Sequence, residues 1–167
     1  MLSKSVFNAL NSELTRERFA EDAYMAMAGV FQSNNLLGFT AWGKKNSHEE
    51  AKHMEGFFDY ICDRDNVPVF EALEAFTPNT AQDPQDVLGT TLALLNQALE
   101  LEKTVTEAIK QIYAQAESEE DDATLVFLHP YLTEQVDSEH DLTTMIGYLK
   151  STGVVGLVAK NEKLEKG

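Results

Sequence analysis

The segment Asn46–Phe57, NSHEEAKHMEGF, places an acid and a histidine in the middle of a helical pattern. Asn46, Glu50, His53 and Phe57 follow one another in steps of four, three and four residues. Because an α-helix has about 3.6 residues per turn, these four side chains share one face. The same stripe continues on both sides with Phe39, Gly43 and Tyr60. Ligand-type side chains therefore interrupt a stripe that is otherwise typical of a buried helix face.

Breaker residues divide the 167-residue chain into long helical segments. Apolar periodicity predicts helices over residues 5–32, 36–64, 84–116 and 121–151 and a short fifth helix over 154–164. Asp83 is the expected N-cap of the third helix, with Pro84 in its first turn. The first and third links are short and predict antiparallel hairpins, whereas the second, of about 20 residues, is long enough to cross the bundle. We therefore predict an all-α antiparallel four-helix bundle with one long crossover between helices 2 and 3.

The other three helices carry equivalent stripes with equivalent interruptions. Stepping by three and four residues, the stripes are interrupted near their middles by Glu13 and Glu17 in the first helix, Glu102 in the third, and Gln135 and Glu139 in the fourth. Mid-height positions of an antiparallel bundle meet in space, so these side chains should lie close together.

Such a cluster of acids needs a positive partner. Burying a carboxylate costs several kcal/mol even after relaxation, and neighbouring carboxylates repel one another. No Lys or Arg lies on the stripes, so a bound metal is the best physical account. Carboxylates with one histidine suit iron, manganese or zinc. Glu50 and His53, one turn apart, can bind one ion or share a pair, and Tyr24, on the same face as Glu17, would then be a candidate one-electron donor.

Composition narrows the function class. Thirteen basic and 28 acidic residues give a net charge of −15, which argues against binding to nucleic acid or to an anionic membrane surface. No run of 18 apolar residues predicts a membrane span, and no secretory signal is recognisable, so we expect a cytoplasmic protein, or an organellar one if a transit peptide has been removed. The single cysteine, Cys62, is expected to be a small core residue.

Four motifs together resemble those of the ferritins. They are ERFAEDAY at 17–24, SHEEAKH at 47–53, LEKTV at 101–105 and YLTEQV at 131–136. The resemblance covers nearly the whole chain in order, and is greatest to the non-haem ferritins of bacteria and of marine algae or cyanobacteria. It implies a single ferritin-like domain over residues 1–167.

The resemblance also implies a di-iron ferroxidase centre built from Glu17, Glu50, His53, Glu102, Gln135 and Tyr24. Glu17 and His53 would bind the first iron. Glu50 would bridge the two irons, and Glu102 would bind the second, with Gln135 nearby.

A third iron site is implied by Glu49, Glu134 and Asp137. Ser138 stands where microbial ferritins often have a further Glu, and Glu139, one residue on, is the candidate substitute ligand or mobile carrier. Haem is not expected, because Ala51 occupies the position of the haem-binding Met of bacterioferritins.

The function expected from the resemblance is iron storage and detoxification. Fe²⁺ would be oxidised with O₂ or H₂O₂ and mineralised inside a homo-oligomeric shell, expected to be a 24-mer. The alternatives are a soluble di-iron oxidase or peroxidase without mineral storage, and a plain helical interaction module that binds no metal.

Overall fold

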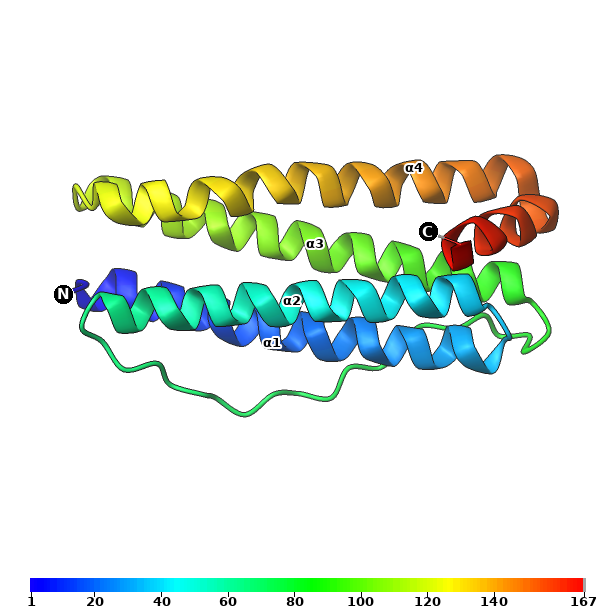
Figure 1. Cartoon of the computed structure of the whole chain (residues 1–167), viewed down its shortest axis with the longest axis horizontal. Coiled ribbons are helices and arrows are strands. Elements are labelled where there is room, and N and C mark those ends of the chain that lie inside the picture. Colours follow the sequence, from blue (N-terminus) through cyan, green and yellow to red (C-terminus); the bar gives the residue numbers. More distant parts are fainter. Residues whose placement is uncertain (167) are drawn as a thin grey trace.

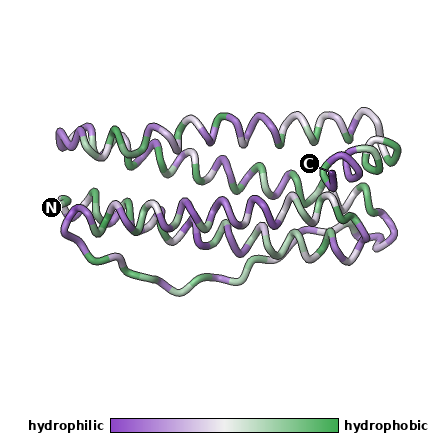
Figure 2. The backbone as a smooth tube through the Cα atoms, viewed as in Figure 1, coloured by the Kyte–Doolittle hydropathy of each residue, from purple (hydrophilic) through white to green (hydrophobic). Residues whose placement is uncertain are grey.

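The predicted all-α architecture is confirmed. The computed structural model describes residues 1–166, which form four α-helices and no strand: α1 (Lys4–Ser33), α2 (Leu37–Asp63), α3 (Val87–Ser118) and α4 (Asp122–Lys166). The helices lie side by side in one bundle (Figure 1). Hydrophilic and hydrophobic residues alternate along each of them (Figure 2), as expected of helices that bury one face.

The connections follow the predicted topology. Short links join α1 to α2 and α3 to α4, whereas residues 64–86 run the length of the bundle beside α1 and α2 (Figure 1). Asn11 on α1 holds this crossover by accepting from the Val69 N–H at 2.7 Å and donating to the Val69 carbonyl at 3.0 Å. Arg18 also donates to the Glu71 carbonyl at 3.1 Å. Side chains of α1 therefore provide hydrogen-bond partners for backbone groups of the extended crossover, which has no neighbouring strand.

The third helix begins later than expected. Asp86, not Asp83, is its N-cap, and its carboxylate accepts from the Gly89 N–H at 2.7 Å. Asp83 accepts from the Gln85 N–H at 2.9 Å and so forms a local turn before the helix. Pattern alone could not separate two Asp residues three positions apart that are both competent caps.

The chain turns back after the fourth helix. Gly153 has φ 61° and ψ −146°, angles outside the helical range that favour glycine, and they break α4 where the short fifth helix was expected. Asn161 in the returning segment accepts from the Gly38 N–H at 2.9 Å and the Phe39 N–H at 3.2 Å, which caps the start of α2. A Cβ at Gly38 would lie 1.9 Å from the Asn161 carbonyl oxygen, so this contact requires glycine.

Among the described helices, only α4 is long and apolar enough to cross a membrane by length and composition. Its apolar stretch runs through the break at Gly153, and part of it is buried inside the bundle. Leu142, Ile146 and Leu149 in this stretch are core residues. Packing accounts for this part of the apolar stretch, whereas Val154, Val155 and Val158 are exposed.

Two apolar clusters fill the ends of the bundle. The Phe31 cluster contains Tyr24, Met27, Phe31, Leu36, Phe39, Leu94, Leu95, Ala98, Leu142, Met145, Ile146, Leu149 and Leu157. The Phe57 cluster contains Leu2, Val6, Leu10, Leu14, Phe57, Ile61, Val105, Ile109, Ile112 and Leu128. Cys62 is exposed, so its predicted core position is wrong; it directly follows the buried Ile61 and therefore faces outward.

Candidate metal centre

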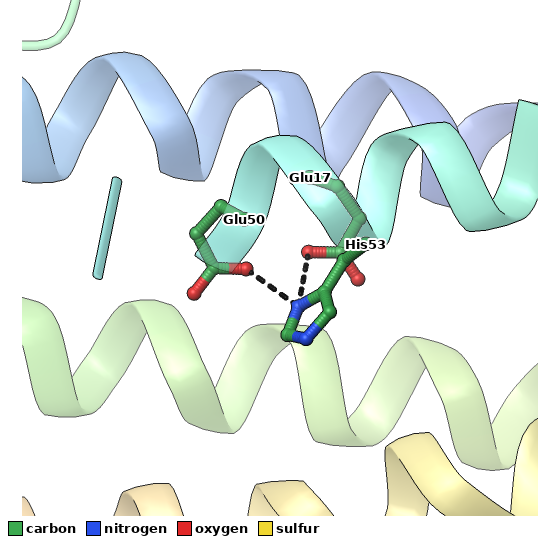
Figure 3. Close-up of side chains that lie close together, drawn as sticks. All are labelled: Glu17, Glu50 and His53. Atoms are coloured by element: carbon green, nitrogen blue, oxygen red, sulfur yellow. Dashed lines mark hydrogen bonds and ion pairs between the residues drawn. The ribbon is translucent and has the colours of Figure 1, made fainter. Parts of the chain in front are cut away.

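Between the two clusters, α1 and α2 bring three ligand-type side chains together. Glu17, Glu50 and His53 each offer one atom, and these atoms lie within 4.8 Å of one another. His53 Nδ1 is 3.0 Å from Glu50 Oε2 and 3.9 Å from Glu17 Oε2 (Figure 3). Glu17 and Glu50 are 1% and 6% exposed. Two buried carboxylates and an imidazole thus lie close enough together to hold one metal ion.

Glu17 is the least compensated of these groups. Neither of its carboxylate oxygens has a hydrogen-bond partner. Burial, followed by repulsion from Glu13 and Glu50, raises the pKa of Glu17 well above its ordinary value. A carboxylate without a donor is costly to bury, so this position requires either a proton or a cation.

A second group of side chains adjoins the first from α3 and α4. Glu102 is 4% exposed and accepts from the Tyr24 hydroxyl and, at 2.9 Å, from Gln135 Nε2. Burial, followed by repulsion from Glu50, raises the pKa of Glu102 to about 7. Burial and the charge of Glu102 raise the pKa of Tyr24 well above 10.0. The charge of Glu50 therefore raises the pKa values of two further buried carboxylates, Glu17 and Glu102.

His53 connects this centre to the surface. Its Nε2 atom is 3.1 Å from Glu134 Oε2, on the opposite side of the ring from Glu50. Burial alone lowers the pKa of His53, but the hydrogen bond and charge of Glu50, with those of Glu134, outweigh it and raise that pKa. The Glu134 side chain is 48% exposed, so it lies at the boundary between the buried centre and solvent.

A cavity of about 840 Å³ opens beside the centre. Its lining includes Tyr24, Glu49, Glu134 and Asp137, and it extends to the C-terminal helical segment. Glu49 also pairs with Lys45 at 3.4 Å. Three of the four acids expected at a third iron site thus share one cavity wall.

Glu139, the fourth of these acids, does not line this cavity. Its Oε1 atom accepts from the Thr106 hydroxyl at 2.6 Å on α3. Thr106 thus holds the Glu139 carboxylate here, and the expected role of Glu139 as a substitute ligand or mobile carrier stays a prediction.

The ion pair between Arg16 and Glu13 was not predicted from the inward-facing stripes of the helices. Arg16 lies off the buried face of α1, yet its guanidinium reaches the carboxylate of Glu13, which is fully buried. Burial, opposed by Arg16, raises the pKa of Glu13 to about 7. Glu13 was visible as an acid on the inward stripe, but the length of the Arg16 side chain let a cation enter from a neighbouring face.

Comparison with known proteins identifies the family of this chain. Residues 7–152 match the family model described as the ferritin-like domain. The chain belongs to the ferritin family. A bacterial non-heme ferritin from Staphylococcus epidermidis is 33% identical over 153 residues, which cover 92% of this chain and 87% of the relative. The ferritin from Staphylococcus aureus has the same identity and coverage.

Solved ferritins share the fold. The open-pore ferritin of the archaeon Archaeoglobus fulgidus superposes with a TM-score of 0.88 at 28% identity, covering 99% of this chain and 98% of that one. Its engineered closed form gives a TM-score of 0.89 at 28% identity, over 99% and 97% of the two chains. Iron storage is the general function of ferritins.

Proposed function

We propose that this ferritin oxidises Fe²⁺ to Fe³⁺ at a di-iron centre and stores the product as a ferric mineral. The observation that carries the proposal is the convergence of Glu17, Glu50 and His53 within 4.8 Å, with Glu17 lacking any donor. Iron is the substrate and cargo of this centre.

The positions of the side chains suggest their roles. Glu17 and His53 hold the first Fe²⁺, and Glu50, whose charge acts on both Glu17 and Glu102, bridges to the second. Glu102 binds the second ion, with Gln135 beside it. Because Gln135 is neutral, the second ion is held less tightly than the first, which suits a centre that must release its product.

The redox step needs an external acceptor. Each Fe²⁺ loses one electron, and O₂ takes up the two electrons and two protons to form H₂O₂. Alternatively, H₂O₂ takes up the same electrons and protons to form two water molecules. Where one Fe²⁺ alone is bound, Tyr24, which is hydrogen-bonded to Glu102, is placed to supply the second of these two electrons.

Fe³⁺ leaves the pair through the cavity, which is lined by four acids and also by Lys45, Lys160 and Lys163. Glu134 contacts His53 and shares the cavity wall with Glu49 and Asp137, so these three acids are our candidates for a third iron site. Glu139 is proposed as a mobile carrier, which requires it to leave Thr106. The mineral is expected inside a 24-subunit shell in the cytoplasm.

The test is to add excess Fe²⁺ to the purified protein in air. We expect rapid growth of Fe³⁺ absorbance, turnover far above two irons per subunit, and a large soluble particle by size-exclusion chromatography. Glu17→Ala and His53→Ala should lose the fast phase, whereas His48→Ala, at an exposed histidine of the same helix, should keep it. Oxidation limited to two irons in a small oligomer would instead identify a soluble di-iron oxidase. A fast phase that survives both site variants would overturn the assignment.

A further inference from the structure

Glu13 is a buried carboxylate for which the proposed di-iron centre has no role. It lies one turn before Glu17 on α1 and is 0% exposed. One of its oxygens contacts Arg16, and the other, Oε1, has no hydrogen-bond partner. A fully buried carboxylate with a free oxygen is costly unless a further cation can reach it.

Glu13 borders the metal centre electrostatically. Among the charged neighbours of Glu17, Glu13 raises the pKa of Glu17 most, ahead of Glu50. Glu13 in turn responds to the charges of Glu50 and His53. An ion held by the Glu13 carboxylate would therefore be one side chain away from the cluster of Glu17, Glu50 and His53.

Arg16 also borders a groove on the outside of the bundle. Its side chain is 30% exposed and borders an outer groove of about 360 Å³ between α1 and α3. Glu100 and Glu107 line the same groove, and their side chains are 72% and 66% exposed. Lys103 and Lys110 pair with these acids at 2.8 Å, so an Arg16 side chain turned outward would share Glu100 or Glu107 with a lysine. The Glu13 carboxylate would then lose the guanidinium that contacts it.

The charges favour a transient ion at Glu13 over a permanent one. Five carboxylates act on this region, namely Glu13, Glu17, Glu50, Glu102 and Glu134. Among the described residues, Arg16 pairs with one of them, Glu13, and His53 contacts three others, Glu17, Glu50 and Glu134. Two Fe²⁺ ions would add four positive charges, which with Arg16 balance the five carboxylates. Arg16 should therefore leave Glu13 while ions enter and return once the pair is full.

We propose that Glu13 is an entry ligand gated by Arg16. An incoming divalent cation displaces Arg16, binds between Glu13 and Glu17, and moves on to the position held by Glu17, Glu50 and His53. Arg16 both lines the groove between α1 and α3 and contacts Glu13, so this groove is the side from which the ion would enter, past Lys103. This inference rests on the proposed di-iron centre and adds a route of access to it.

The test uses Co²⁺, which is stable in air and reports its coordination by its visible absorption. Stopped-flow mixing with the metal-free assembled protein gives the binding rate, and a titration gives the number of ions bound per subunit. We expect two ions per subunit in the wild type, in Glu13→Gln and in Arg16→Gln. Binding should be at least about tenfold slower in Glu13→Gln and faster in Arg16→Gln. The control is Arg18→Gln on the same helix, where Arg18 serves only the crossover, and it should bind at the wild-type rate.

The outcomes separate the two proposals. If the wild type binds no Co²⁺, the di-iron centre itself is wrong. If all variants bind two ions at the wild-type rate, the centre stands and the role of Glu13 is refuted. If Glu13→Gln does not fold, Arg16→Gln alone decides, because a purely structural ion pair predicts no acceleration when Arg16 is removed.

Discussion

The ends and the middle of this bundle are built from the same four helices but serve opposite purposes. Along each helix, the buried polar residue of the middle layer (Glu17, Glu50, Glu102 or Gln135) lies between a stretch of the Phe31 cluster and a stretch of the Phe57 cluster. Burial of apolar side chains at the two ends stabilises the folded protein. The middle layer destabilises the metal-free protein, because its carboxylates are desolvated and repel one another.

This contrast explains how the carboxylates of the middle layer can be held together before any metal binds. A cluster of like charges would separate if the surrounding backbone could move. Here the helices are fixed on both sides by packed apolar side chains, and interiors of this density deform little. The ends therefore hold the carboxylates close together, and the proposed cations would return part of the lost stability when they bind.

The largest expected effect comes from opening one of the apolar ends. Phe57 is 0% exposed, and its ring centroid lies 5.2 Å from that of Phe127 and 4.7 Å from that of Tyr131. Phe57→Ala should lower the free energy of unfolding by about 3–5 kcal/mol, through lost burial and the cavity left behind. Urea unfolding of the metal-free protein measures this. Phe58→Ala, at the neighbouring 36% exposed position, is the matched control and should cost less than half as much. Equal losses would contradict the assignment of Phe57 to the core.

A smaller effect is expected on the pH dependence of stability, to which the carboxylates of the middle layer contribute and the apolar ends do not. Glu102 has a pKa of about 7 in the folded protein against 4.5 for the free side chain. Between these values the folded state holds a proton that the unfolded state has released. Stability of the metal-free protein is therefore greatest below about pH 4.5 with respect to this group, and is lost as pH rises to about 7, by roughly 3 kcal/mol at about 1.4 kcal/mol per pH unit. Glu13, with the same folded value, acts in the same direction.

Urea unfolding at a series of pH values with a chelator present tests this dependence. Glu102→Gln should flatten the slope, whereas Phe57→Ala should lower stability equally at every pH because it removes no titrating group. Added Co²⁺ should restore stability at high pH, since the ions replace the protons. A chelated protein whose stability does not fall between pH 5 and 8 would show that its carboxylates are compensated in another way.

Helical periodicity was sufficient to predict the buried layer. Glu17, Glu50, Glu102 and Gln135 are each buried where the stripes place them, since a 3.6-residue repeat fixes which face turns inward. The same rule should have excluded Cys62, which is five residues after Phe57 and one after Ile61 on the buried face.

Other features depend on side-chain reach, which periodicity does not encode. Arg16 lies off the stripe but bends inward to Glu13, and Glu139 lies on the stripe but is drawn to Thr106. Pro130 lies inside α4, and the break in the backbone angles of this helix falls at Gly153. Asn161 caps α2 from more than 120 positions away, a contact that only the folded chain brings about.

The smallest expected effect lies at the boundary between the two regions, at Tyr24. Its ring belongs to the Phe31 cluster, while its hydroxyl donates to Glu102 in the polar layer. Tyr24→Phe keeps the ring and leaves Glu102 with Gln135 as its remaining side-chain donor, so the metal-free protein should lose about 1–2 kcal/mol. Tyr148→Phe, at a 41% exposed tyrosine of α4, is the control and should be neutral. During Fe²⁺ oxidation, a transient tyrosyl radical signal should disappear in Tyr24→Phe and persist in Tyr148→Phe. A loss above about 3 kcal/mol would instead mean that the ring had shifted, and that Tyr24 acts mainly as part of the apolar end.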